Sequence, residues 1–136
     1  MLFRSVTFVI NGNITRTATV RFISSGTGSY LFTDVPDAIT SISAKTAWNL
    51  RKRITGITSD NGQFTVDFTG SLELPGGDLA TAGFPIGDNV VNALDYAVLR
   101  GAWGQFAAGD INGDGWTTND DYLTMKANWY KRGDAE

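Results

Sequence analysis

The stretch that most constrains the fold of this chain is Asp110–Asp121, a twelve-residue segment rich in side-chain oxygen. Oxygen-bearing side chains occupy its positions 1, 3, 5, 9 and 12, and glycine occupies position 6. A hard cation such as Ca²⁺ takes roughly six to eight oxygen ligands, and a glycine at position 6 permits the sharp turn around the ion. The segment is therefore predicted to be a calcium-binding loop, and a solvated acidic turn is the alternative.

The ligands predicted in this loop are five side chains and one backbone carbonyl. Asp121 stands at position 12, where glutamate is more usual, so its shorter side chain requires the following helix to approach the ion closely. Trp116 at position 7 contributes its carbonyl oxygen. The complete predicted set is Asp110, Asn112, Asp114, Trp116, Thr118 and Asp121.

A second copy of the same arrangement lies 26 residues earlier in the chain. Gly87–Tyr96 aligns with Gly113–Tyr122, and the same offset places Leu99 on Met125. Each copy reads as a loop followed by a helix with an apolar stripe. Two such units can bury their stripes against each other, so the two copies are predicted to pack together.

The first copy differs from the second at the start of its loop. If Asp95 is position 12, positions 1 and 3 are Phe84 and Ile86, which cannot coordinate a cation. A six-residue insertion after Asp78 places an aspartate at position 1 instead. A second Ca²⁺ is therefore predicted, and the alternative is a metal-free loop held by Asx-type hydrogen bonds. Its predicted ligands are Asp78, Asp88, the Val90 carbonyl, Asn92 and Asp95.

The first half of the chain has the pattern of short strands separated by turns. Val6, Phe8 and Ile10 alternate on one face, and Asn11-Gly12-Asn13 follows them as a hairpin signal. Helical periodicity begins only after Gly76-Gly77. Further strands are predicted over residues 17–23, 30–32, 39–44 and 63–68.

These patterns predict an α+β chain of two domains. Residues 1–75 form an N-terminal antiparallel β-sandwich, and residues 76–136 form a two-repeat loop-and-helix calcium-binding domain. Charge follows the same division, because residues 1–75 carry a net charge of +2 and residues 76–136 a net charge of −5. The excess of acidic side chains thus lies in the half that contains the loops.

The second half resembles dockerin modules, which pair two calcium loops, each followed by a helix, with aspartate at position 12. The resemblance rests on Gly109–Gly115 and covers about residues 76–136. It implies an EF-hand-like fold and a cohesin domain of another protein as the partner. By family position, the partner-facing residues are Ala93, Leu94, Arg100 and Gly101 in the first repeat and Asn119, Asp120, Lys126 and Ala127 in the second.

The first half resembles small carboxypeptidase-regulatory-like or transthyretin-like β-sandwich modules. The resemblance rests on Ser43–Arg53 and on the preceding turn Phe32–Pro36. It implies a non-catalytic module that precedes the dockerin-like half in a large exported bacterial protein.

Composition excludes several kinds of chemistry. Cysteine and histidine are absent, which removes disulfides, thiolate nucleophiles, Cys/His zinc sites and imidazole acid–base catalysis. The whole chain is acidic, so nucleic acid is not an expected partner. No apolar run is long enough to span a bilayer, and Met1–Arg4 lacks the features of a signal peptide.

The expected function is that of a non-catalytic extracellular or cell-surface module for protein attachment or assembly. The expected partner is another protein domain or copies of this chain. In one alternative, Met1–Ile10 is an apolar strand that joins a neighbour's open sheet edge and builds a filament. In another, Trp48 and the basic run Arg51–Arg53 bind carbohydrate; a charged strand edge is the competing interpretation of that run.

Overall fold

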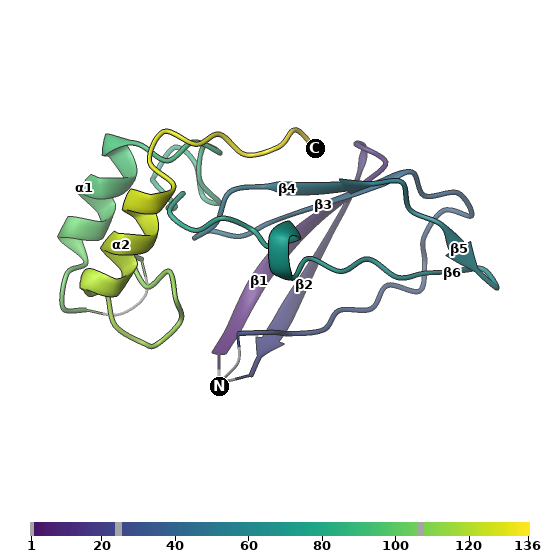
Figure 1. Ribbon diagram of the computed structural model, residues 1–136, viewed down its shortest axis with the longest axis horizontal. Helices are drawn as coiled ribbons and strands as arrows, with labels where there is room; N and C mark the ends of the chain where they lie inside the picture. Colours follow the sequence, from purple (N-terminus) through teal and green to yellow (C-terminus); the bar gives the residue numbers. More distant parts are fainter. Residues whose placement is uncertain (1, 24–25, 106–107) are drawn as a thin grey trace.

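The structure is a computed structural model that describes residues 2–23, 26–105 and 108–136. Helices lie at one end of an elongated molecule, and the strands occupy the rest of it (Figure 1). The elements are, in chain order, β1 (Leu2–Ile10), β2 (Ile14–Phe22), β3 (Ser41–Lys45), β4 (Lys52–Thr55), β5 (Ser59–Asp60), β6 (Gln63–Phe64), the 3₁₀ turn η1 (Gly70–Leu72), α1 (Ala93–Gly101) and α2 (Asn119–Ala127).

The main sheet is antiparallel and has the order β2-β1-β3-β4. β1 and β2 form the predicted hairpin, whose turn places Asn11 at φ 55° and Gly12 at φ 74°, backbone values that asparagine and glycine tolerate best. β1 pairs with β2 along its whole described length and with β3 only from Thr7 to Ile10. The terminal strand is thus an inner strand of the sheet; Met1 lies outside the described residues.

One face of this sheet carries the first hydrophobic cluster, as the alternation in the sequence predicts. Val6, Phe8 and Ile10 of β1 are all buried. The other fully buried members are Val20, Ile39, Ile42 and Ala44. Burial of apolar surface at about 25 cal/mol per Å² is the main force that holds the sheet against the segments crossing this face.

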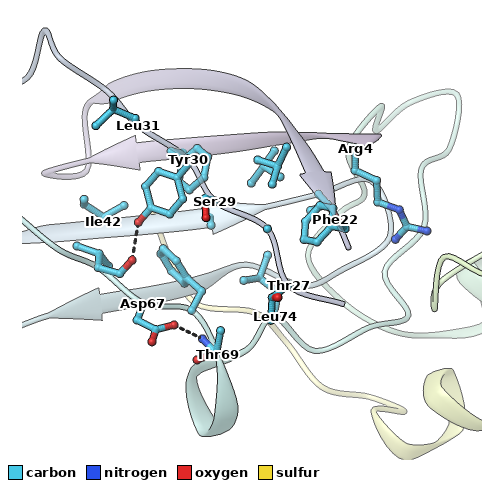
Figure 2. A pocket seen from close by; sticks show the side chains of 18 of the residues that line it. Arg4, Phe22, Thr27, Ser29, Tyr30, Leu31, Ile42, Asp67, Thr69 and Leu74 are labelled. Atoms are coloured by element: carbon cyan, nitrogen blue, oxygen red, sulfur yellow. Dashed lines mark hydrogen bonds between the residues drawn. The ribbon is translucent and has the colours of Figure 1, made fainter. Parts of the chain in front are cut away.

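Those crossing segments leave a cavity of about 1160 Å³ on the apolar face (Figure 2). Aromatic rings gather in it: the ring centroid of Tyr30 lies 4.4 Å from that of Phe8, and the Phe32 centroid lies 5.2 Å from Phe8. The Tyr30 hydroxyl donates a hydrogen bond of 2.8 Å to the Val66 carbonyl. Burial raises the pKa of Tyr30 to about 12, so this hydroxyl remains a donor.

The segments over the cavity are less regular than the sequence predicts. Residues 30–32 form no strand, and of residues 63–68 only Gln63 and Phe64 pair, in the two-stranded sheet β5-β6. Their aromatic and β-branched side chains fit a buried surface whether or not the backbone joins a ladder. Packing against the first cluster, rather than strand pairing, therefore accounts for the pattern at these positions.

A second hydrophobic cluster lies under the helices. Leu99 of α1 and Met125 of α2, equivalent residues of the two copies, are fully buried in it. Leu50 belongs to the same cluster, and Trp48 packs against it. The remaining buried members are Leu79, Val91 and Ile111.

The predicted fold class is wrong, because the chain is mainly β rather than a β-sandwich followed by a helical calcium-binding domain. Strands outnumber helices six to two in the described part of the chain, and each α-helix has nine residues, so the chain is mainly β. The long segments before the helices are non-helical loops held by side-chain carboxylates. The apolar side of the helices is covered partly by Leu50 and Trp48, which precede residue 76.

The C-terminal segment returns from the helices to the sheet (Figure 1). The N–H of Val91 donates to the Lys131 carbonyl at 2.9 Å, and the N–H of Asp134 donates to the Arg51 carbonyl at 2.9 Å. The Asp134 carboxylate accepts from the N–H of Arg53 at 2.7 Å. The last residues thus connect the first loop to the start of β4. No helix in the described residues is long and apolar enough to cross a membrane.

Candidate metal centre

Two groups of three aspartates lie at the two loops that the sequence singles out. In each group, carboxylate oxygens from all three residues lie within 4.8 Å of one another. The first group is Asp78, Asp88 and Asp95, and the second is Asp110, Asp114 and Asp121. The structure therefore brings together every aspartate of the two predicted ligand sets.

The second loop is organised around the carboxylate of Asp110. Its Oδ1 accepts hydrogen bonds from the N–H groups of Gly113 at 2.9 Å and Asp114 at 3.1 Å, and its Oδ2 accepts from Gly115 at 3.0 Å. Gly115 has φ 94°, a conformation that favours glycine, at the predicted sharp turn. The chain thus curls around one carboxylate and directs its amides toward it.

The other end of the second loop is fixed by Asp121. Its Oδ1 accepts from the N–H of Ile111 at 2.7 Å, and its Oδ2 accepts from the N–H of Thr118 at 2.8 Å. The second contact belongs to a capping box at the start of α2. One carboxylate therefore joins the start of the loop to the start of the helix.

The first loop repeats these contacts despite its insertion. Asp78 Oδ1 accepts from the N–H of Asp88 at 3.1 Å, and Asp78 Oδ2 accepts from the N–H of Asn89 at 2.8 Å. Asp95 accepts from the N–H groups of Leu79 and Asn92, both at 2.8 Å, and caps α1. Asp78 thus makes the contacts that Asp110 makes in the second loop, as expected if it fills position 1.

Asn89 lets the first loop turn where the second uses glycine. Its φ is 66°, in the left-handed region that asparagine adopts more readily than most residues. Its side-chain amide also bonds the N–H of Arg51 at 2.8 Å and the carbonyl of Asp134 at 3.0 Å. Asparagine in place of glycine therefore adds a side-chain connection between the loop, the residue before β4 and the C-terminal segment.

The remaining predicted ligands fall into three kinds of position. Val90 and Trp116 are equivalent, since the N–H of each donates to the aspartate two residues earlier, at 3.2 Å and 2.9 Å. Asn92 uses its side-chain oxygen to cap α1, accepting from the N–H of Leu94 at 3.0 Å. Asn112 Oδ1 accepts from the N–H of Asp114 at 3.1 Å, and Thr118 is the N-cap residue of α2.

Burial makes both aspartate groups electrostatically costly without a cation. Asp78 and Asp121 are fully buried, and Asp95 and Asp110 are nearly so. Desolvation raises the pKa of Asp78 to about 6, and it raises the pKa values of Asp95 and Asp110 from their ordinary range. Buried carboxylates that face one another favour a bound cation, because it removes both the desolvation cost and the mutual repulsion.

The sheet supplies one buried basic side chain to each loop, which sequence reasoning missed. Lys45 Nζ lies 2.5 Å from Asp78 Oδ2. Arg4 donates to the carbonyl oxygens of Asp110 and of Ile111, the latter at 3.0 Å, and its guanidinium lies 4.1 Å from the Trp48 ring centroid. Arg4 and Asp110 are 106 residues apart in the chain, so no local pattern indicates the contact.

The donor set fits a hard divalent cation. Each group offers three carboxylates, and the second loop adds an amide oxygen from Asn112 within the same turn. Histidine and cysteine, the ligands that favour zinc or copper, are absent from the chain. Calcium at these loops stays a prediction.

Residues that the dockerin resemblance places toward a partner all reach the surface. Every one of the eight is exposed, on α1 or α2 or beside them. Leu94 of α1 is 61 % exposed and Leu123 of α2 is 52 % exposed, so each helix has a large apolar side chain on its outer face. Trp116 is also half exposed.

Trp48, the centre of the predicted carbohydrate contact, has a structural position instead. It is half buried, packs against the second hydrophobic cluster and stacks on Arg4. Of the neighbouring basic run, Arg51 is buried and bonds the Ser43 hydroxyl at 2.9 Å. Only Lys52 and Arg53 belong to β4 at the sheet edge, as the edge interpretation requires.

No protein-family model matches this chain, and no curated protein matches it significantly. Two solved structures are similar to it, both of type II cohesin–X–dockerin complexes from Acetivibrio cellulolyticus. In a C-terminal interface mutant, the matched chain is 17 % identical with a TM-score of 0.64, and the match covers 96 % of this chain and 83 % of that one. In an N-terminal interface mutant, the identity is 18 %, the TM-score 0.61 and the coverage the same. This chain shares its fold with a component of such complexes.

Proposed function

We propose that this chain is a non-catalytic module that attaches to another protein in an extracellular assembly, and that calcium fixes the loops beside its binding surface. The observation that carries the proposal is the pair of largely buried aspartate groups, each of which ends in the first turn of a helix with an exposed outer face. The shared fold with components of cohesin–X–dockerin complexes supports the attachment role.

In this proposal one Ca²⁺ binds each loop. The second loop provides Asp110, Asn112, Asp114, Thr118, Asp121 and the Trp116 carbonyl, and the first provides Asp78, Asp88, Asn92, Asp95 and the Val90 carbonyl. The ion would cancel the repulsion among the carboxylates, and its binding free energy would add to the stability of the folded loops. Millimolar extracellular calcium keeps even a moderate site of this kind filled.

The proposed partner is a protein domain that covers the exposed helical surface. α1 and α2 present leucine, alanine and mixed charges outward, a composition suited to an interface with an apolar centre and a polar rim. The titles of both similar structures name a cohesin, so a type II cohesin domain is the first partner to test. The calcium loops would hold the two helices at a fixed spacing for that contact.

Calcium binding is tested by isothermal titration of the metal-free chain. We expect binding at two sites, with the second-loop site lost in Asp114→Ala, because Asp114 contributes a carboxylate to that group. The matched control is Asp37→Ala, which removes one exposed carboxylate outside both groups. Unchanged stoichiometry and affinity in Asp114→Ala would contradict the ligand assignment.

Attachment is tested by titrating a type II cohesin domain with calcium and then with chelator. We expect binding in calcium only, weakened by Leu94→Asp or Leu123→Asp, which place a charge in the exposed apolar surface. Lys52→Asp on β4 is the control, since it adds a charge away from the helices. Cohesin binding that is unchanged in both leucine variants would rule out this surface as the binding site.

The two alternative functions have less support from the structure. β1 is an inner strand that pairs with β2 along its described length and with β3 from Thr7 to Ile10, so only its edge over residues 2–6 is left for strand addition to a neighbour in a filament. Trp48 stacks on Arg4 and packs inward, so it provides no open platform for a sugar ring.

A further inference from the structure

We propose that Lys45 is a built-in cation of the first loop: it holds that loop folded without metal and makes its calcium affinity lower than that of the second loop. This inference rests on the proposed function, since it concerns the same two sites. The observation behind it is an ammonium group seated directly on a predicted calcium ligand in one copy of the repeat only.

Lys45 is anchored so that its ammonium group cannot move aside easily. It lies on β3, is 2 % exposed, and directs its side chain away from the apolar cavity. An ammonium group has three N–H donors. Nζ lies 2.5 Å from Asp78 Oδ2, 2.9 Å from the Asn49 carbonyl and 3.3 Å from the Thr46 carbonyl, so all three have acceptors.

The same contact uses up acceptor capacity on Asp78. Its Oδ2 already receives the N–H of Asn89 and the Lys45 ammonium, and its Oδ1 receives the N–H of Asp88. A carboxylate oxygen accepts about two hydrogen bonds. Only Oδ1 retains capacity for a metal ion, and the fixed positive charge of Lys45 lies on the neighbouring oxygen.

The second loop has a basic side chain nearby but not on its ligand. Arg4 bonds the main-chain carbonyls of Asp110 and Ile111, and its guanidinium approaches Asp110 Oδ2 only to 4.0 Å, beyond hydrogen-bond distance. Asp110 Oδ2 accepts from the N–H of Gly115, and Asn112 adds an oxygen that the first loop lacks at position 3. Asp110 accepts three hydrogen bonds, as Asp78 does, so acceptor capacity does not distinguish the loops. The difference lies in the ammonium charge placed on Asp78 and in the oxygen that Asn112 adds to the second loop.

The two loops therefore differ in what they do. The Lys45 ammonium compensates one of the three negative charges of Asp78, Asp88 and Asp95, so this loop has less repulsion to relieve when metal is absent. A divalent ion entering the loop meets a like charge within a few ångströms. The first loop is thus a structural element with weak calcium affinity, and the second is the site that responds to calcium.

The test measures calcium affinity of the first loop alone, in an Asp114→Ala background that removes the second site. Replacing Lys45 by methionine keeps the side-chain length and removes the charge. We expect Lys45→Met to raise the calcium affinity of the first loop by about tenfold or more. Lys52→Met, the same charge change on the opposite face of the sheet, is expected to leave it unchanged.

Hydrogen exchange of the unmutated chain in chelator gives a second test, which does not depend on whether a Lys45 variant folds. We expect the amides of Asp88 and Asn89 to stay protected, because the Lys45 ammonium holds their acceptor Asp78 in place. The amides of Gly113 and Gly115, whose acceptor Asp110 carries no ammonium group, are expected to exchange. Equal exchange in both loops would overturn the structural role of Lys45.

The outcomes separate this inference from the proposed function. First-loop affinity that is unchanged or lower in Lys45→Met overturns the inference, and so does the absence of first-loop binding in both variants. Neither result affects calcium binding at the second loop. Absence of calcium binding by the original chain at Asp110–Asp121 would instead overturn the proposed function.

Discussion

At the scale of single residues, the carboxylate of Asp78 depends on a glycine nine residues later. Gly87 has φ 87°, and a side chain built on it would collide with both carboxylate oxygens of Asp78. A substitution there must therefore strain the backbone and displace the residue around which the first loop turns. Sequence alone gives no sign of this, because insertion residues separate the two positions.

We predict that Gly87→Ala lowers the free energy of unfolding by about 1–3 kcal/mol, from backbone strain and the displaced carboxylate. Urea unfolding in the presence of calcium measures the change. Gly83→Ala is the matched control, since nothing lies within 4 Å of its added Cβ. Equal urea midpoints for Gly87→Ala and Gly83→Ala would show that the observed position of Asp78 does not contribute to stability.

The metal-free chain should also be more stable when mildly acidified. Burial raises the pKa of Asp78 to about 6, above the roughly 3.9 of an aspartate in an unfolded chain. Because the folded state has the higher pKa, its stabilising contribution is full below about pH 4 and is lost as pH rises through about 6. In chelator, the thermal midpoint is expected to increase between about pH 7 and about pH 5.5.

With calcium present the direction should reverse, because the ion requires ionised carboxylates and protons compete with it. In chelator, Asp78→Asn should make the thermal midpoint nearly independent of pH over this interval, because asparagine does not ionise. A midpoint in chelator that falls on acidification over this interval would contradict the predicted sign.

How far these residues can be predicted from the sequence depends on their separation along the chain. The second loop is contiguous, so spacing alone identifies Asp110, Asp114 and Asp121. Assigning Asp78 to the first loop needs the repeat as well as an assumed insertion. Lys45 and Arg4 could not be found, since they reach the loops from strands 33 and 106 residues away.

At the scale of elements, the two helices should be equally important for stability. Leu99 and Met125 are equivalent in the repeat, and both are fully buried in the second hydrophobic cluster. We predict that Leu99→Ala and Met125→Ala each cost about 2–5 kcal/mol, from lost burial and the cavity left behind. Thermal unfolding in calcium measures both.

Leu94→Ala on the exposed face of α1 is the control, expected within about 0.5 kcal/mol of the original chain. A large loss in this control would mean that Leu94 packs against the chain itself rather than facing a partner. A small loss in only one of the two core variants would show that the repeats differ in packing.

Element types were predicted better than their grouping. The hairpin of β1 and β2, β3 and both helices are where periodicity and turn residues place them. The predicted fold class was wrong, because periodicity shows which side of a helix is apolar but not what covers it; the boundary at residue 75 stays a prediction. Leu50 and Trp48, which cover the helices, lie in the segment assigned to the sheet.

At the scale of the whole molecule, polar contacts join the sheet to the loops at three points. Arg4 reaches the second loop, Lys45 reaches the first, and the C-terminal segment bonds Arg51 and Arg53 at the start of β4. The Lys45–Asp78 contact is a buried ion pair, which needs its geometry to offset desolvation, so it is the contact most sensitive to the position of its partner. Displacement of a loop should therefore disturb the strands that carry these residues.

Chelation should loosen the molecule in a graded way. We predict that calcium removal deprotects amides of residues 110–116 most, those of α1 and α2 next, and those of the β1–β2 hairpin least. The reason is that the hairpin belongs to the first hydrophobic cluster, which has its own set of buried side chains. Hydrogen exchange with calcium and with chelator measures the order.

The end of β1 near Arg4 is the sensitive position in that experiment. Because Arg4 bonds carbonyls of Asp110 and Ile111, chelation should raise exchange near Arg4 more than near Ile10 at the turn of the hairpin. Arg4→Met should abolish this difference by disconnecting the strand from the loop. Uniform deprotection of residues 2–74 and 76–136 would instead mean that one cooperative core unfolds together, and the division of the chain at residue 75 would be wrong.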